Sequence, residues 1–294
     1  MDQHPSPFRA FEPLSEAIRL ACAWEATAPK PGNVHPDASF ADLTFDDFVK
    51  SAEAVAPVLA RARKLGVGHA VFESIRATRA VVKSNTNLGI VLLLAPLAAV
   101  ATERPLHDGI GDVLERLSRD DAAWVYRAIR FAQPGGLGSV DAEDVSQEPT
   151  GTLLDVMKLA ADRDGVAAQY ANEFAWVLDE GVPFLKSRRT DFQSVPLTTI
   201  VELHLRLLAR HPDTLIARKC DVAEAIAVSR QAQAVLDAGS LETATGRRLL
   251  SEFDRWLRED SNRRNPGTTA DLVTACLFAA LRDGVIESPT LESM

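Results

Sequence analysis

The sequence contains little cysteine, and the few cysteines argue against disulfide bonds and a structural metal site. Three occur in 294 residues, at wide spacing and with no CxxC pair. An odd number so dispersed favours neither a disulfide framework nor a zinc site. Cys22 and Cys276 stand in apolar helical contexts, Ala-Cys-Ala and Ala-Cys-Leu. We therefore expect small, buried side chains in a protein of the reducing cytoplasm.

Long hydrophobic runs are missing as well. The longest covers residues 88–101, contains Pro96 and is too short to cross a bilayer. It predicts a buried core helix. The first eight residues lack the basic and apolar regions of a signal peptide. These features predict a cytoplasmic location and no membrane partner.

Basic residues are in the minority. The chain has 32 Lys and Arg against 41 Asp and Glu, for a formal net charge of −9. An open nucleic-acid groove neutralises many phosphates with Lys and Arg, so we expect no nucleic-acid partner. A small anionic ligand is still possible, because a few local cations and helix N-termini are enough to bind one.

Several familiar catalytic signatures are also absent. The chain has no HExxH pair, no GxSxG elbow, no P-loop and no dinucleotide-binding glycine fingerprint after a strand. This excludes the zinc-peptidase, α/β-hydrolase and Rossmann-type chemistry that depends on those motifs. A site in this chain must instead use helix ends, interhelical loops and inward-facing polar side chains.

Helical periodicity dominates, and no segment alternates convincingly like a strand. Apolar residues recur at intervals of three and four, separated by Gly, Pro or capping residues. The pattern predicts an all-α fold, a single compact multi-helix bundle of about ten helices that spans residues 1–294 as one domain. The expected helices cover residues 14–28, 45–59, 69–83, 88–101, 120–132, 155–178 in two pieces broken near Gly165, 198–211, 221–237, 241–260 and 270–282.

The first break between helices that carries unexplained polar residues lies after residue 25. Glu25 is on the apolar side of its helix, where a carboxylate needs a partner or a cation. Lys30 can serve as a point charge for phosphate, and Gly32 allows close approach to a ligand. Asn33 and His35 follow directly. The alternative interpretation is a helix stop with a surface glutamate and a snorkelling lysine.

Two further breaks are candidate anion sites. Asn85, Thr86 and Asn87 precede the apolar helix, whose free N–H groups can bind an anion; helix capping is the compatible alternative. The glycine-rich loop around Gly136 could cradle a phosphate, although a flexible connection is the simpler interpretation. Asp141 and the carboxylates after it could equally bind magnesium.

The fourth candidate region joins two separate segments. Arg218 and Lys219 place adjacent cations just after an expected helix end. Asp271 falls in the expected first turn of the last helix, where favourable interaction with the helix dipole explains it equally well. The candidate residues of the two segments are Asp213, Arg218, Lys219, Asn265, Thr268 and Asp271.

These segments, in this order, resemble the triphosphoribosyl-dephospho-CoA synthase family. The matching pieces are EATAPKPGNV (residues 25–34), NTNLGIVLLL (85–94), the PGGLG loop, Asp213-Thr214 and NPGTTADLVTACLF (265–278). The resemblance implies an all-α transferase of prosthetic-group biosynthesis that uses ATP and magnesium. In its reaction the 2′-hydroxyl of dephospho-CoA attacks the ribose anomeric carbon of ATP, and adenine leaves. Such a step needs cations for the triphosphate, a base and stabilisation of an oxocarbenium-like centre.

The resemblance also implies roles for the candidate residues. Glu25, Asp271 and Asp213 would be the catalytic carboxylates, with base and metal ligand not distinguished. Glu25, Asp141 and Asp271 would hold Mg²⁺. Contacts to phosphate, ribose or the rest of the substrate would fall to Lys30, Gly32, Asn33, His35, Asn85, Thr86, Asn87, Gly136, Arg218, Lys219, Asn265 and Thr268.

The chain departs from the family pattern in two places. It reads Asn85-Thr86-Asn87-Leu88-Gly89 where Asn-Thr-His-Lys-Gly is usual, and Gly32-Asn33-Val34 where Gly-Leu-Val-Asp is usual. The missing His and Lys leave two alternatives to dephospho-CoA transfer. One is a related enzyme of one-carbon carrier (methanopterin or methanofuran) biosynthesis acting on a phosphorylated precursor; the other is a non-catalytic nucleotide-binding helical module. The expected partners are ATP and a dephospho-CoA-like small molecule, and a homodimer is left open.

Overall fold

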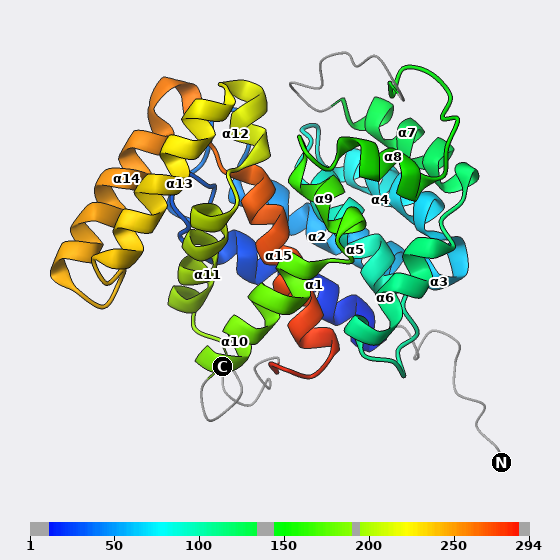
Figure 1. Cartoon of the computed structure of the whole chain (residues 1–294), viewed down its shortest axis with the longest axis horizontal. Coiled ribbons are helices and arrows are strands. Elements are labelled where there is room, and N and C mark those ends of the chain that lie inside the picture. The colour runs from blue at the N-terminus through cyan, green and yellow to red at the C-terminus, as the bar shows by residue number, and fades with distance from the viewer. Residues whose placement is uncertain (1–11, 134–143, 190–194, 288–294) are drawn as a thin grey trace.

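The chain folds into closely packed helices, which a computed structural model describes for residues 12–133, 144–189 and 195–287 (Figure 1). Within these ranges no strand forms, and an isolated bridge joins His35 and Ala38. The predicted compact all-α fold is confirmed. The helices are α1 (Glu12–Thr27), α2 (Phe45–Leu59), α3 (Ala62–Leu65), α4 (Val67–Val81), α5 (Leu88–Ala99), α6 (Leu106–Glu115), α7 (Arg119–Ala132), α8 (Leu153–Ala160), α9 (Gly165–Ala171), the π-helix η1 (Trp176–Gly181), α10 (Val182–Arg188), α11 (Leu197–Arg210), α12 (Thr214–Lys219), α13 (Val222–Asp237), α14 (Ala244–Asn262) and α15 (Gly267–Arg282).

Local capping signals set several helix starts. Thr44 before α2, Ser118 before α7 and Thr152 before α8 each form a capping box with an aspartate three residues later. Each box satisfies backbone donors that would otherwise have no partner in the first turn. The sequence predicted the first of these boxes, and α2 begins where it indicated.

Two helices without a polar face form the centre of the molecule. In α5 every residue from Ile90 to Ala98 is buried, and in α15 every residue from Leu272 to Ala280 is buried. A helix that is apolar all round must be surrounded by protein. In Figure 1 α15 crosses the middle of the molecule beside α1 and α5, and these helices share one contiguous hydrophobic cluster.

The start of α15 differs from the sequence prediction. The helix begins at Gly267 rather than at residue 270, with Pro266 at the N-cap and no side-chain cap. Asp271 therefore lies in the second turn, and the first turn has no acidic residue. Because the dipole effect is confined to the first turn, the dipole explanation of Asp271 was wrong.

The end of α14 turns sharply and brings two distant loops together. The backbone leaves helical geometry at Glu259–Ser261. After this turn, Asn265 Nδ2 donates to the carbonyl oxygen of Gly32 (3.2 Å). Before the turn, Asp254 Oδ1 accepts from Gly32 N (2.8 Å). Gly32 has a φ of +74°, and a Cβ there would lie 2.9 Å from Leu257. The loop after α1 is thus fixed against the segment that enters α15.

No described helix combines the length and the apolar content needed to cross a bilayer.

Candidate functional site

A cavity of about 910 Å³ lies where the N-terminal ends of α5, α9 and α15 meet the C-terminal end of α12. Convergent helix N-termini favour an anionic ligand, because their backbone N–H groups lack helical partners. The cavity brings together ten residues that the sequence singled out. They are Glu25, Asn33, Asn85, Thr86, Asn87, Arg218, Lys219, Asn265, Thr268 and Asp271.

Two carboxylates stand at the polar floor of this cavity. The side chain of Glu25 is 4% exposed, and Asp271 is half-buried at the cavity wall. Asp271 has no hydrogen-bond partner within the described part of the chain. Burial, and then the neighbouring charge of Glu25, raise the pKa of Asp271 well above its usual value. A carboxyl group with a raised pKa is suited to bind a cation or to accept a proton.

Gly89 makes this placement of Asp271 possible. A Cβ atom on Gly89 would overlap Oδ2 of Asp271, so only glycine lets the carboxylate approach the first turn of α5 so closely. The glycine of the NTNLG segment therefore has a packing role that connects two of the predicted site segments.

Lys30 has a different position from the one predicted. Its side chain is fully buried and does not line the cavity; Nζ forms a salt bridge with Glu25 Oε1 at 2.9 Å. The same ammonium group donates to the carbonyl oxygens of Glu25 and Ala28. With three oxygen partners behind the cavity wall, Lys30 is a counter-ion for Glu25, and this geometry does not offer it to a phosphate.

Asp213 was predicted to be catalytic, and the structure places it outside the cavity lining. It is buried, and Oδ1 accepts from Leu215 N (2.9 Å) and Ile216 N (3.1 Å) at the start of α12. Oδ2 accepts from the backbone N (2.7 Å) and Oγ1 (2.8 Å) of Thr269 in α15. Burial raises the pKa of Asp213, and these hydrogen bonds oppose the rise. Asp213 joins two helices and has no free oxygen directed at a substrate.

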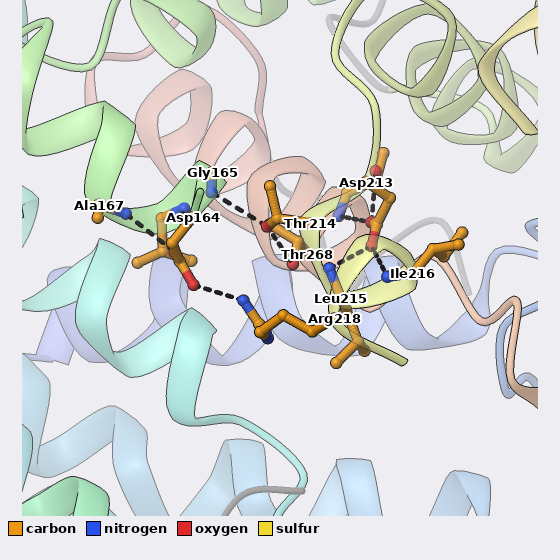
Figure 2. A network of polar contacts seen from close by, with 11 residues as sticks. Asp164, Gly165, Ala167, Asp213, Thr214, Leu215, Ile216, Arg218 and Thr268 are labelled. Atoms are coloured by element: carbon orange, nitrogen blue, oxygen red, sulfur yellow. Dashed lines mark hydrogen bonds and ion pairs between the residues drawn. The ribbon is translucent and has the colours of Figure 1, made fainter. Parts of the chain in front are cut away.

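A polar network continues from this junction to α9 (Figure 2). Thr214 Oγ1 accepts from Gly165 N at 3.1 Å and donates to Thr268 Oγ1 at 3.2 Å. Asp164 accepts from two backbone N–H groups at the start of α9, and its Oδ2 pairs with Arg218 at 2.6 Å. The network fixes α9, α12 and α15 relative to one another at the cavity edge.

The side chains of the Asn85-Thr86-Asn87 segment form hydrogen bonds within the protein. Asn87 is buried and exchanges hydrogen bonds with Thr78 Oγ1 (3.0 and 3.2 Å). Thr86 Oγ1 lies 2.6 Å from Ser51 Oγ. Asn85 Oδ1 accepts from Leu88 N at 3.3 Å, so it caps α5 as one sequence interpretation predicted. All three residues nevertheless line the cavity.

Three cations at the cavity were not recognised from the sequence. Arg79, Lys83 and Arg163 line it together with the predicted Arg218 and Lys219. The ammonium groups of Lys83 and Lys219 form no ion pair within the described ranges. Arg79 lies in the last turn of α4, and Lys83 follows the end of this helix by two residues; Arg79 donates a hydrogen bond to the carbonyl oxygen of Lys83. The signal available in the sequence was this pair of basic residues shortly before Asn85.

The remaining predicted residues do not reach the cavity or cannot be placed. Gly32 fixes a loop, as described above. His35 lies outside the lining, and burial followed by the charge of Arg258 lowers its pKa. Gly136 and Asp141 lie outside the described residues, so their predicted phosphate and magnesium contacts stay predictions.

The floor of the cavity fits a magnesium ion. Within the described ranges no three His, Cys, Asp or Glu side chains form a ready metal cluster. Magnesium commonly uses one or two carboxylates, water and the phosphates of its nucleotide. Glu25 lines the cavity; its Oε1 bonds Lys30, and its Oε2 has no hydrogen-bond partner in the described chain. Glu25 and Asp271 are thus the carboxylates that could meet a nucleotide-bound cation.

Comparison with known proteins gives the family. The family model described as ATP:dephospho-CoA triphosphoribosyl transferase (CitG) matches residues 11–289. A solved structure from Archaeoglobus fulgidus, provisionally assigned as a triphosphoribosyl-dephospho-CoA synthase, shares the fold with a TM-score of 0.62. It is 24% identical, and the match covers 80% of this chain and 98% of that chain. No curated protein matches. Because the family match extends over nearly the whole sequence, the chain belongs to the CitG family of ATP:dephospho-CoA triphosphoribosyl transferases.

Proposed function

We propose that this cavity is the active site for triphosphoribosyl transfer from ATP to the 2′-hydroxyl of dephospho-CoA, the reaction of the family. One observation carries the proposal. The half-buried Asp271, with a raised pKa and no hydrogen-bond partner in the described chain, shares a cavity with Arg79, Lys83, Arg163 and Lys219. A base beside cations is what attack by a hydroxyl on a triphosphate-bearing ribose requires.

In the proposed step the acceptor 2′-oxygen forms a bond to C1′ of the ATP ribose. The bond from C1′ to the adenine nitrogen breaks, and its electron pair leaves with adenine. The carboxylate of Asp271 takes the proton from the attacking hydroxyl, and the departing base gains a proton, so that neutral adenine is released. The triphosphate stays on the transferred ribose, so atoms and charge balance without a further co-reactant.

We assign Glu25 the role of holding the nucleotide-bound cation. Its Oε1 is anchored by Lys30. We therefore assign Oε2, which has no hydrogen-bond partner in the described chain, as the ligand. Magnesium bound there would neutralise triphosphate charge. Lys219 and Arg218 lie at the end of α12, next to the first turns of α9 and α15, and we assign them to the triphosphate.

Adenine release tests the proposal directly. The purified protein would be incubated with ATP, magnesium and dephospho-CoA, and adenine followed by chromatography. We expect adenine in proportion to a product whose mass corresponds to triphosphoribosyl-dephospho-CoA. Omitting the acceptor and substituting D271N are the controls. Folded wild-type protein that releases no adenine above these controls would overturn the proposal.

A second acceptor is favoured by one specific observation. Leu88 is half-buried and lines the cavity where the family pattern has a lysine, and the adjacent Asn87 bonds Thr78 instead of presenting an imidazole. A phosphorylated precursor of a one-carbon carrier is therefore the alternative acceptor. Thermal-shift measurements with such precursors and with dephospho-CoA, each in the presence of ATP, would rank the two. A larger shift with dephospho-CoA would reject the alternative.

We place the reaction in the cytoplasm. The observation that supports this is the state of the three cysteines, all of which are free and none of which forms a disulfide.

A further inference from the structure

The cavity has an apolar limb that neither a triphosphate nor a ribose requires. Its wall comes from two helices, α7 and α8. The apolar side chains that line it include Val125 and Ile129 of α7 and Leu153, Val156, Met157 and Leu159 of α8, and Tyr126 of α7 lies among them. An apolar pocket wall of this size indicates a ligand part with little charge.

The outer end of this limb is unusually exposed for its chemistry. Leu159 is 58% exposed, while Val156 and Ile129 are half-buried. Val156 and Leu159 are three residues apart on α8, so they lie on the same face of the helix. A single exposed leucine needs no explanation, but one that continues a cavity wall extends the binding surface outward.

The limb also joins the cationic side of the cavity. Near their starts α4 and α7 are tied by a hydrogen bond from Gly68 N to Asp121 Oδ1 (2.8 Å). Further along, Phe72 and Phe131 pack with their ring centroids 6.3 Å apart. The two helices therefore run side by side in the same direction, and Lys83 and Gln133 beyond their ends both line the cavity. On the α8 side of the limb, Arg163 lies three residues after the end of this helix and also lines the cavity.

We propose that this limb binds the pantetheine arm of dephospho-CoA and so selects the acceptor; this rests on the proposed function. Dephospho-CoA is ADP extended from its outer phosphate by a long, uncharged arm. The reacting 2′-hydroxyl of dephospho-CoA and the anomeric carbon of ATP must meet at Asp271. Each of these atoms belongs to a ribose that carries an adenine, so both adenines lie close to the cavity floor. The arm is separated from that hydroxyl by the diphosphate. It is therefore the substrate part that extends to an apolar limb beyond flanking cations.

A comparison of two acceptors tests the assignment. ADP has the same adenosine, 2′-hydroxyl and diphosphate as dephospho-CoA but lacks the arm. We expect wild-type kcat/KM to be at least about tenfold higher for dephospho-CoA than for ADP, because the arm buries apolar surface along α8. In the double variant V156S/L159S this preference should fall to about one- to threefold, with kcat/KM for ADP and KM for ATP unchanged.

The variant L197S is the matched control. Leu197 is 39% exposed at the start of α11 and does not line the cavity, so its removal should leave the preference intact. Thermal unfolding would establish that the double variant is folded, and retained turnover of ADP would show that its site is intact.

The outcomes separate the two proposals. Equal use of both acceptors by the wild type, or an equal loss with both in V156S/L159S, would overturn the arm site while the transfer reaction stands. A raised KM for ATP in the variant would place the donor adenine in the limb and would also overturn it. Absence of adenine release with either acceptor would reject the proposed function itself.

Discussion

Asp271 is the residue whose chemistry depends most on its surroundings. Burial and the charge of Glu25 raise its pKa, so the folded protein holds this proton to a higher pH than the unfolded chain does. The stability that this contributes is present at low pH and is lost as pH rises from about 4 towards the raised pKa. Gly89 allows the carboxylate to lie against α5, and the same buried environment makes it a stronger base than an exposed aspartate.

We predict that D271N lowers kcat by about 10²- to 10⁴-fold and removes the acid limb of the pH–rate profile. Without ligands, the unfolding temperature of D271N relative to wild type should increase as pH rises from 4, because the amide has no charge to bury. Activity and thermal unfolding measured from pH 4 to 9 would show both effects. A variant with an unchanged profile but a much higher magnesium requirement would identify Asp271 as a metal ligand instead.

Lys30 shows why a charge is hard to assign before the fold is known. Glu25 lies on the apolar side of α1, and the sequence indicated that it needs a partner; that partner is the lysine five residues later. From the sequence, the lysine after a helix stop was expected to be exposed to phosphate. Whether the loop turns it inward depends on Gly32 and on contacts with residues more than 200 positions away, which no local pattern encodes.

We predict that K30M destabilises the protein by about 3–5 kcal/mol, because it leaves Glu25 buried without its counter-ion. The double variant E25Q/K30M should recover part of that loss, since the amide replaces the unpaired charge. K50M, which removes the exposed pair with Asp46, is the control and should leave stability unchanged. Denaturant unfolding would measure all three. Equal stability of K30M and wild type would contradict the counter-ion role.

At the scale of helices, length decided what could be predicted. The long periodic helices α1, α2, α5, α7, α11 and α13 lie close to their predicted ranges. The short elements α3, α12 and η1 have four to six residues, too few for periodicity to distinguish them from turns. Asp213 was singled out because Asp213-Thr214 is one of the pieces that resemble the family. The short helix that it caps and its partner Thr269 in α15 could not be predicted from local sequence.

We predict that D213A lowers stability by about 2–4 kcal/mol, because it removes the cap of α12 and leaves buried donors of Thr269 without a partner. Since α12 and α15 both border the cavity, KM for ATP should rise as well. D221A, which removes the exposed cap of α13, should cost about 1 kcal/mol with unchanged kinetics. A D213A enzyme with normal stability and a pure loss of kcat would restore the predicted catalytic role.

At the scale of the whole molecule, the site is an exception to the overall charge. The chain has a formal net charge of −9, yet the cavity lining is balanced: five cationic side chains line it together with the five carboxylates Glu25, Asp42, Asp144, Asp164 and Asp271. Among the cations, Lys83 and Lys219 have no ion-pair partner in the described ranges. The net-charge argument from the sequence could not locate this group of cations. It arises because α4, α12 and the segment after α8 end at the same place, a consequence of packing around α5 and α15.

We predict that K83E and K219E each raise KM for the anionic substrates about tenfold at low ionic strength, with kcat changed less. Both cations are exposed, so added salt should shrink the difference from wild type. K186E, on an exposed lysine of α10 away from the cavity, changes the net charge equally and is the matched control. If K186E raised KM as much, the overall charge rather than the cavity would determine substrate binding. A selective effect of K219E on ATP and of K83E on dephospho-CoA would further show that the two ends of the cavity hold different substrates.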